Sequence, residues 1–283
     1  MTMKTKTLAR AIAGSFAAAA ALGAGMAQAA ETTDTLDQKL WLRVGAFRPS
    51  IESNVQVDHP QTGTAGTAID FERDLGLAKN KTLPTLMLGA RFFDNWRVEL
   101  EYFHLKRDGN VTLGQLLNVD DSTFPISANV ETRFSSSVYR ASVGYSFVKT
   151  RQAEFGAVLG AHVTKFDISL DGTVTTGGVP VATEREEKNK TIPLPTIGLY
   201  GAYTFTPGWT GSGRVDVFKL RHGQYDGRLV NAQANLIYRA TDNLGIGLGY
   251  RYDDYKVNST RDDFHGHLDY KFRGPQLFVE AGF

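Results

Sequence analysis

Hydrophobic and polar residues alternate with a period of two along most of the chain after residue 39. In Trp96–Tyr102 the even positions are apolar and the odd positions are Arg97, Glu99 and Glu101. In Leu244–Tyr252 the even positions are again apolar, and the odd ones are glycine or arginine. This period places all apolar side chains of a β-strand on one face. The pattern therefore predicts an all-β protein.

The predicted strands occur in pairs joined by short polar turns. Asp94-Asn95 and Pro207-Gly208 are typical of such reversals because these residues tolerate or preset the required φ angles. Four hairpins with one strand before and one after predict ten strands, with eight as the alternative. The strands are predicted at Leu40–Phe47, Leu86–Phe93, Trp96–Tyr102, Tyr139–Phe147, Phe155–Val163, Ile197–Phe205, Trp209–Val217, Val230–Tyr238, Leu244–Tyr252 and Leu277–Phe283.

Long polar segments separate these hairpins and are predicted to be loops. Short turns that alternate with long loops are typical of outer-membrane barrels, which have short periplasmic turns and long extracellular loops. Strands can cross lipid only in a closed barrel, which pairs every backbone group. We therefore predict a transmembrane antiparallel up-and-down β-barrel. The predicted loops are Ser50–Leu83, Asp108–Thr132, Asp171–Thr191, Arg221–Gly227 and Val257–Asp263, with Glu184–Lys188 at a solvated tip.

The N-terminus has the pattern of an export signal. Three basic residues precede the alanine-rich apolar run Ala11–Gly25, and Ala27-Gln28-Ala29 is a typical cleavage site. An uncleaved membrane anchor is the alternative, but the run is short for a spanning helix. We predict a signal peptide at 1–29 and a barrel domain at 30–283, exported through the periplasm to the cell outer membrane.

The net charge and the absence of cysteine limit the possible partners and the cellular compartment. Removing Lys4, Lys6 and Arg10 with the signal leaves 28 of the 31 basic residues against 30 acidic ones, a formal charge of about −2. This balance predicts no nucleic-acid partner. The chain has no cysteine, which suits the oxidising periplasm. No cofactor is predicted.

The last strand alternates up to the terminal aromatic residue Phe283. We expect this strand to be recognised by the barrel-assembly machinery. Aromatic residues near the short turns predict a periplasmic girdle at headgroup depth. The predicted girdle consists of Trp96, Phe147, Phe205, Trp209 and Phe283.

The apolar positions change parity near the C-terminus. Leu268, Tyr270 and Phe272 are even-numbered, whereas the apolar residues of Leu277–Phe283 are odd-numbered. One extra residue at Gly274-Pro275 would keep both sets facing outward, so a β-bulge is predicted there. Alternatively, His265–Arg273 projects above the bilayer.

The inward positions of the predicted barrel carry charges of both signs. Charges in a filled interior must pair with one another; the other interpretation is a narrow polar conduit. Ten strands enclose little more space than eight, which side chains fill. The predicted lumen charges are Arg43, Arg91, Arg97, Glu99, Glu101, Arg140, Glu154, Arg214, Asp216, Arg239, Arg251, Asp253, Lys271, Arg273 and Glu280.

Candidate binding and catalytic residues are few. Asp70, Glu72 and Asp74 share one side of an extended segment and are weak candidates for binding a divalent cation or cationic groups of lipopolysaccharide, because a solvated strand extension explains them better. No other metal site is predicted.

Two groups of residues suggest an outer-rim enzyme. His265 and His267 lie beside Asp262-Asp263. His104 is expected to face lipid near Ser135 and Ser137, as in a serine hydrolase that attacks an acyl ester.

The segment Gly198–Trp209, together with Phe283, resembles the OmpA/OmpW-type superfamily of small outer-membrane barrels. Ile69–Leu77, followed by Lys81–Pro84, is similar to a group of proteobacterial barrels within it. The resemblance implies the barrel, and it carries over no catalytic residues. We expect a non-enzymatic envelope role, either structural, in surface interaction, or in narrow passage of small or hydrophobic solutes, with outer-membrane lipid and lipopolysaccharide as partners. The alternative is a membrane enzyme acting on lipid A or peptides.

Overall fold

A computed structural model describes residues 35–58, 66–114, 116–119, 122–176, 179–222, 225–261 and 264–283. The predicted signal peptide lies outside these residues. Within them the chain is all-β apart from one short 3-10 turn, η1 (Thr35–Asp37). None of the helical structure in this part of the chain is long and apolar enough to cross a membrane.

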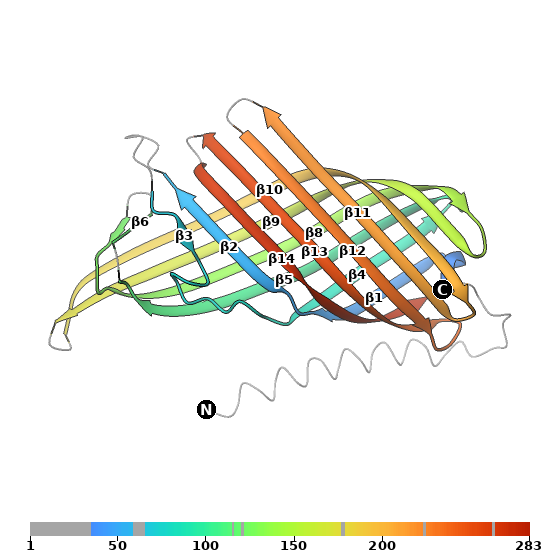
Figure 1. Ribbon diagram of the computed structural model, residues 1–283, viewed down its shortest axis with the longest axis horizontal. Coiled ribbons are helices and arrows are strands. Elements are labelled where there is room, and N and C mark those ends of the chain that lie inside the picture. The colour runs from blue at the N-terminus through green and yellow to red at the C-terminus, as the bar shows by residue number, and fades with distance from the viewer. Residues whose placement is uncertain are drawn as a thin grey trace.

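Twelve strands of the described chain form one antiparallel sheet, in which most neighbours are consecutive in sequence (Figure 1). Strands β6 and β7 form a separate pair. The predicted all-β, up-and-down arrangement is confirmed. The strands are β1 (Leu40–Phe47), β2 (Ser50–Val57), β3 (Ile69–Asp70), β4 (Leu83–Phe92), β5 (Trp96–Thr112), β6 (Leu117–Val119), β7 (Ser122–Phe124), β8 (Asn129–Lys149), β9 (Ala153–Thr176), β10 (Val179–Thr206), β11 (Trp209–His222), β12 (Tyr225–Arg239), β13 (Leu244–Arg261) and β14 (Phe264–Gly282).

Strand β1 pairs along both of its edges, with β4 and with β14. The order of strand pairs therefore returns to β1, and the sheet has an enclosed face and an outer face. The upper half of β14, toward its N-terminal end, pairs with β2, which follows β1 after Arg48-Pro49 in the same register. The sheet has more strands than predicted because β2 and β3 form within Ser50–Leu83, which was predicted to be a loop.

The other four predicted loops are also largely strand in their described residues, since β11 continues to His222, β12 begins at Tyr225 and β13 continues to Arg261. Strand β5 continues to Thr112, and β9 pairs with β10 nearly to their shared turn. The charged run Glu184–Lys188 belongs to β10 rather than to a loop tip. These extensions remain paired because apolar side chains still line the enclosed face, as Leu170 shows at 2% exposure. In Figure 1 the strands β8–β10 reach beyond the others at the end opposite the C-terminus.

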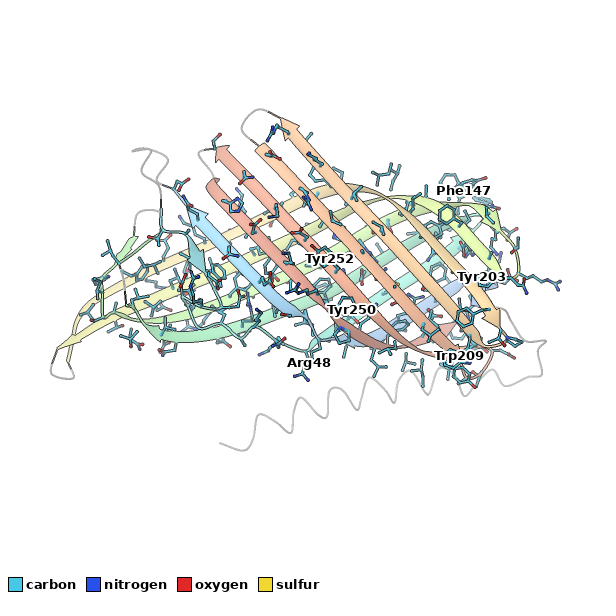
Figure 2. The ribbon with its side chains drawn as sticks, viewed as in Figure 1. Arg48, Phe147, Tyr203, Trp209, Tyr250 and Tyr252 are labelled. Carbon is cyan, nitrogen blue, oxygen red and sulfur yellow. The ribbon has the colours of Figure 1, made fainter. Side chains whose placement is uncertain are left out.

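The two faces of the sheet exchange polarity partway along the strands, and we call this the polarity exchange. Nearer the short turns the outer face is apolar and the enclosed face polar, so that Tyr250 is 53% exposed while Arg251 is fully buried. Beyond the exchange Tyr255 is buried and Lys256 points outward. Figure 2 shows Tyr250 about midway along the sheet.

The polarity exchange, and not a bulge at Gly274-Pro275, accounts for the change of parity of the apolar residues in β14. The pairing of β14 with β13 runs through both residues without a register shift. Tyr270 and Phe272 consequently point inward, where they are 1% and 0% exposed. The prediction was wrong because it assumed that the apolar face of a strand points outward along its whole length.

Candidate functional site

Ion pairs cross the enclosed space at its centre. Arg251 donates to Glu101 at 2.5 Å and to Asp253 at 2.7 Å. Arg140 approaches the other oxygen of Glu101 at 2.7 Å. These four side chains are nearly inaccessible to water, with exposed fractions of 0–6%. Buried charges of this kind are tolerated only when each has a partner.

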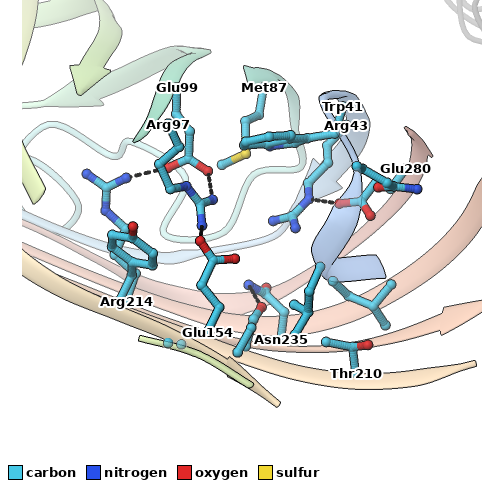
Figure 3. Close-up of a pocket in the computed structure, with 18 of the residues that line it drawn as sticks. Trp41, Arg43, Met87, Arg97, Glu99, Glu154, Thr210, Arg214, Asn235 and Glu280 are labelled. Carbon is cyan, nitrogen blue, oxygen red and sulfur yellow. Dashed lines mark hydrogen bonds and ion pairs between the residues drawn. The ribbon is translucent and has the colours of Figure 1, made fainter. Parts of the chain in front are cut away.

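The network continues toward the short turns. Arg214 bridges Glu99 at 2.6 Å and Asp216 at 2.7 Å. Arg91 makes a two-point contact with Glu154, at 3.0 Å and 2.7 Å. Figure 3 shows Glu99, Glu154 and Arg214 converging from different strands. The ion pairs therefore connect strands across the interior and do not follow one side of it.

A cavity of about 70 Å³ remains near the short-turn end of this network. Trp41, Met87 and Asn235 line it together with the charged residues (Figure 3). A volume of this size holds a few water molecules at most. The cavity offers no room for a larger solute.

Above the network, an apolar core fills the enclosed space. Phe103 contacts Phe47 and Phe272 edge-on, at ring-centroid distances of 6.2 and 5.9 Å. All three are fully buried. The Arg251 guanidinium lies 4.7 Å from the Phe103 ring, so the charged and apolar layers are in direct contact.

The segment after β2 folds into this core as a plug, which we define as Ile69–Leu77. Its Phe71, Leu75 and Leu77 are at most 3% exposed. Glu72 forms an ion pair with the buried Arg107 of β5. Arg107 was not among the predicted lumen charges, although the alternation of Trp96–Tyr102, continued along β5, places it on the inward side.

The plug does not contain a metal site. Glu72 is directed at Arg107, whereas Asp74 accepts hydrogen bonds from Arg73 at 2.8 Å and from the Asp70 backbone at 2.9 Å. The hydrogen bond from Arg73 holds the pKa of the Asp74 carboxyl below its usual value. Across the described residues no group of three His, Cys, Asp or Glu side chains is placed to hold a metal ion.

The structure puts most of the predicted lumen charges on the enclosed face. Lys271 and Arg273 are exceptions, since they point outward and contact Glu52 at 3.6 and 2.8 Å. With no bulge in β14, odd-numbered residues face outward along its whole length. The charges on the enclosed face are Arg43, Arg91, Arg97, Glu99, Glu101, Arg140, Glu154, Arg214, Asp216, Arg239, Arg251, Asp253 and Glu280.

The five predicted girdle residues are exposed on the outer face or at the C-terminus. Their exposed fractions lie between 38% and 53%. Figure 2 shows Phe147 and Trp209 near the end of the sheet that carries the short turns, with Tyr203 beside them.

His104 and Ser137 meet on the outer face at the polarity exchange. They occupy directly paired positions of β5 and β8, and His104 Nδ1 lies 2.9 Å from Ser137 Oγ. Ser135 instead donates to Asp167 at 3.3 Å. No carboxylate of the described residues contacts His104. The structure therefore brings together a base and a nucleophile without an orienting acid.

The second histidine group is only partly described. Asp262 and Asp263 lie outside the described residues. His267 Nε2 contacts Asp269 at 3.1 Å on the outer face. His267 Nδ1 also contacts Asn258, and Asp269 also contacts Lys256 at 3.2 Å. These groups are partly solvated and include no nucleophile.

The fold is similar to that of solved outer-membrane proteins. The outer membrane protease OmpT from Escherichia coli matches 89% of this chain and 99% of its own, with a TM-score of 0.55 and 12% identity. Neisserial surface protein A matches 86% of this chain and 97% of its own (TM-score 0.33, 13% identity). The P. putida toluene transporter TodX matches 87% of this chain and 90% of its own (TM-score 0.35, 10% identity).

No protein-family model matches the chain, and neither does any curated protein. The resemblance to the OmpA/OmpW-type superfamily thus stays a prediction. At 12% identity the likeness to OmpT concerns the fold alone. The chain has the fold of an outer-membrane protein.

Proposed function

We propose that the chain is a closed ten-stranded barrel of the outer membrane, with its short turns in the periplasm and a non-enzymatic envelope role. The ring from β1 through β4, β5 and β8–β14 back to β1 contains ten strands when β2 is counted as the continuation of β1. The interior is closed to solutes, so the barrel serves as an anchored scaffold for the strands that rise above the membrane.

An exposed apolar belt supports the membrane assignment. Leu100, Leu159, Ile197 and Leu248 are 52–64% exposed on the outer face. Soluble monomers rarely expose contiguous apolar patches beyond a few hundred Å². A belt on every side of the sheet matches the lipid-facing band of a transmembrane barrel.

One observation carries the closed-lumen proposal, namely the ionic network sealed by the apolar core. A solute would have to break the pairs that join Glu101 to Arg140 and Arg251, and then separate the rings around Phe103. Both layers are buried, so such an opening has a large desolvation cost. Narrow passage is therefore disfavoured relative to a scaffold role.

Planar-bilayer recording of the refolded protein tests this proposal. We expect no current steps from protein whose folded state is verified by its heat-modifiable electrophoretic mobility. A porin inserted under the same conditions is the positive control. Reproducible steps from the folded wild type would overturn the closed lumen.

A second candidate function follows from the His104–Ser137 contact. His104 could accept the Ser137 proton while Ser137 Oγ attacks an ester carbonyl, and Lys165, paired with Ser137 from β9, would face the developing oxyanion. The site lies where lipid esters would be located in the proposed membrane.

Lipid-ester hydrolysis in mixed micelles tests this candidate. Activity lost in Ser137→Ala and kept in Ser135→Ala would support the hydrolase, because only Ser137 contacts His104. Equal product formation by wild type and Ser137→Ala would remove it.

A further inference from the structure

Three cations form a row across neighbouring strands on the outer face. Lys219 of β11 pairs with Arg228 of β12, and Arg228 pairs with Lys256 of β13. Like charges in directly opposite positions destabilise a sheet. Two such pairs in succession favour an anion that neutralises the row.

Neighbouring carboxylates compensate this charge only in part. Asp254 lies 3.5 Å from Arg228, and Asp269 lies 3.2 Å from Lys256. Lys219 is exposed and has no ion-pair partner among the described residues. The side chains of Arg228 and Lys256 remain 51% and 42% exposed, so their donors stay accessible.

The excess of positive charge extends along β14. Lys271 and Arg273 point outward below the end of the row, and both contact the single carboxylate of Glu52. Lys271 is paired with Asp254 of β13. The outer face of β2 and β11–β14 at this height therefore carries five cations against three carboxylates, and the Arg221–Asp226 pair just above the row adds one charge of each sign.

The outer face of β5, β8 and β9 does not carry such a row. There Ser135 and Ser137 of β8 lie between Lys106 of β5 and Lys165 of β9, and Asp167 pairs with Ser135. The described cations of this part of the sheet do not occupy directly opposite positions, so the cationic row is a local feature.

Apolar side chains lie directly below Lys219 and Arg228. Val217 and Val230 are the next outward residues on the strands of Lys219 and Arg228, and they pair with each other. Val215 and Tyr250 continue this surface, with 48% and 53% exposure. Cations directly above an apolar surface match an amphiphile that has an anionic headgroup and acyl chains.

We infer that Lys219, Arg228 and Lys256 bind the phosphate groups of a phosphorylated lipid in the outer leaflet, with the acyl chains along Val215, Val217 and Val230. This inference rests on the proposed function, since it places the row at the lipid headgroups. It adds a lipid site on one side of the barrel.

Native mass spectrometry of the refolded protein in detergent tests the site. The probes are diphosphoryl lipid A, the same lipid with both phosphates removed, and inorganic phosphate. The variant replaces Lys219, Arg228 and Lys256 by Gln. A matched control with the same charge change replaces Lys106, Arg133 and Arg185, three exposed cations on other strands.

We expect diphosphoryl lipid A to bind the wild type and the control equally, and to bind the Lys219/Arg228/Lys256 variant at least about tenfold more weakly. Equal binding to this variant, or equal binding of the dephosphorylated lipid, would overturn the inference. Binding of inorganic phosphate with no binding of the lipid would identify a free anion as the ligand and overturn the lipid assignment. The binding assay uses folded protein in detergent and does not depend on whether the lumen is closed. Current steps in planar bilayers would therefore refute the closed lumen without changing the lipid-binding result.

Discussion

Removing Arg251 should destabilise the fold more than removing any exposed charge. Arg251→Met leaves Asp253 with the Asn231 amide as its only partner among the described residues, while Glu101 keeps Arg140 at 2.7 Å. Both carboxylates stay buried, so the loss should be about 3–5 kcal/mol, as for other buried pairs that lose one member.

The double variant Arg251→Met/Asp253→Asn separates the lost ion pair from lost packing. It removes the uncompensated carboxylate, so we expect it to recover at least about 1 kcal/mol relative to Arg251→Met. Arg221→Gln is the matched control, because the Arg221–Asp226 pair is exposed and should contribute less than about 1 kcal/mol.

The measurement is a urea titration of refolded protein in lipid vesicles, followed by tryptophan fluorescence and heat-modifiable mobility. The linear dependence of the free energy of unfolding on urea gives the difference between variants. An Arg251→Met variant within about 1 kcal/mol of the wild type would refute the reasoning. It would mean that water reaches the network, and the closed lumen would lose its main support.

Three further predictions use the same titration. Leu75→Ala in the plug should lower the free energy of unfolding by about 2–5 kcal/mol, since Leu75 is fully buried; a change below about 1 kcal/mol would contradict its packing. Leu248→Arg should cost about 2–4 kcal/mol in vesicles if Leu248 faces lipid, and no loss would contradict the belt. Gly247→Ala should cost about 1–3 kcal/mol, because the added Cβ would lie 2.1 Å from the Phe278 ring; Gly213→Ala, with a nearest contact at 3.7 Å, is its control.

The alternation of residues was sufficient to predict the hairpins and most enclosed charges. In Trp96–Tyr102 the side chains alternate without interruption, and the Asp94-Asn95 turn fixes where β5 begins. The contact between His104 and Ser137 was also anticipated, because both lie on outward positions of strands expected to be neighbours.

The upper halves of the strands could not be predicted in the same way. The segment Phe166–Asp171 alternates as regularly as the lower strands, but it lies between the predicted strand, which ended at Val163, and the predicted loop, which began at Asp171, so it was assigned to neither. Its apolar residues face the enclosed core, as do Tyr270 and Phe272. One sequence shows which residues share a face, but not which face points inward, and here the answer changes along each strand.

The polarity exchange also fixes how deeply the proposed barrel sits in the membrane. On β13 the lipid-facing run from Leu244 to Tyr252 is about 30 Å along the strand, or roughly 23 Å after the usual tilt. If the protein moved outward relative to the bilayer, Leu248 and Tyr250 would enter water. If it moved inward, Lys219 and Arg228 would enter the hydrocarbon. A bilayer of different thickness must therefore deform around this protein, since the protein cannot slide to a new depth.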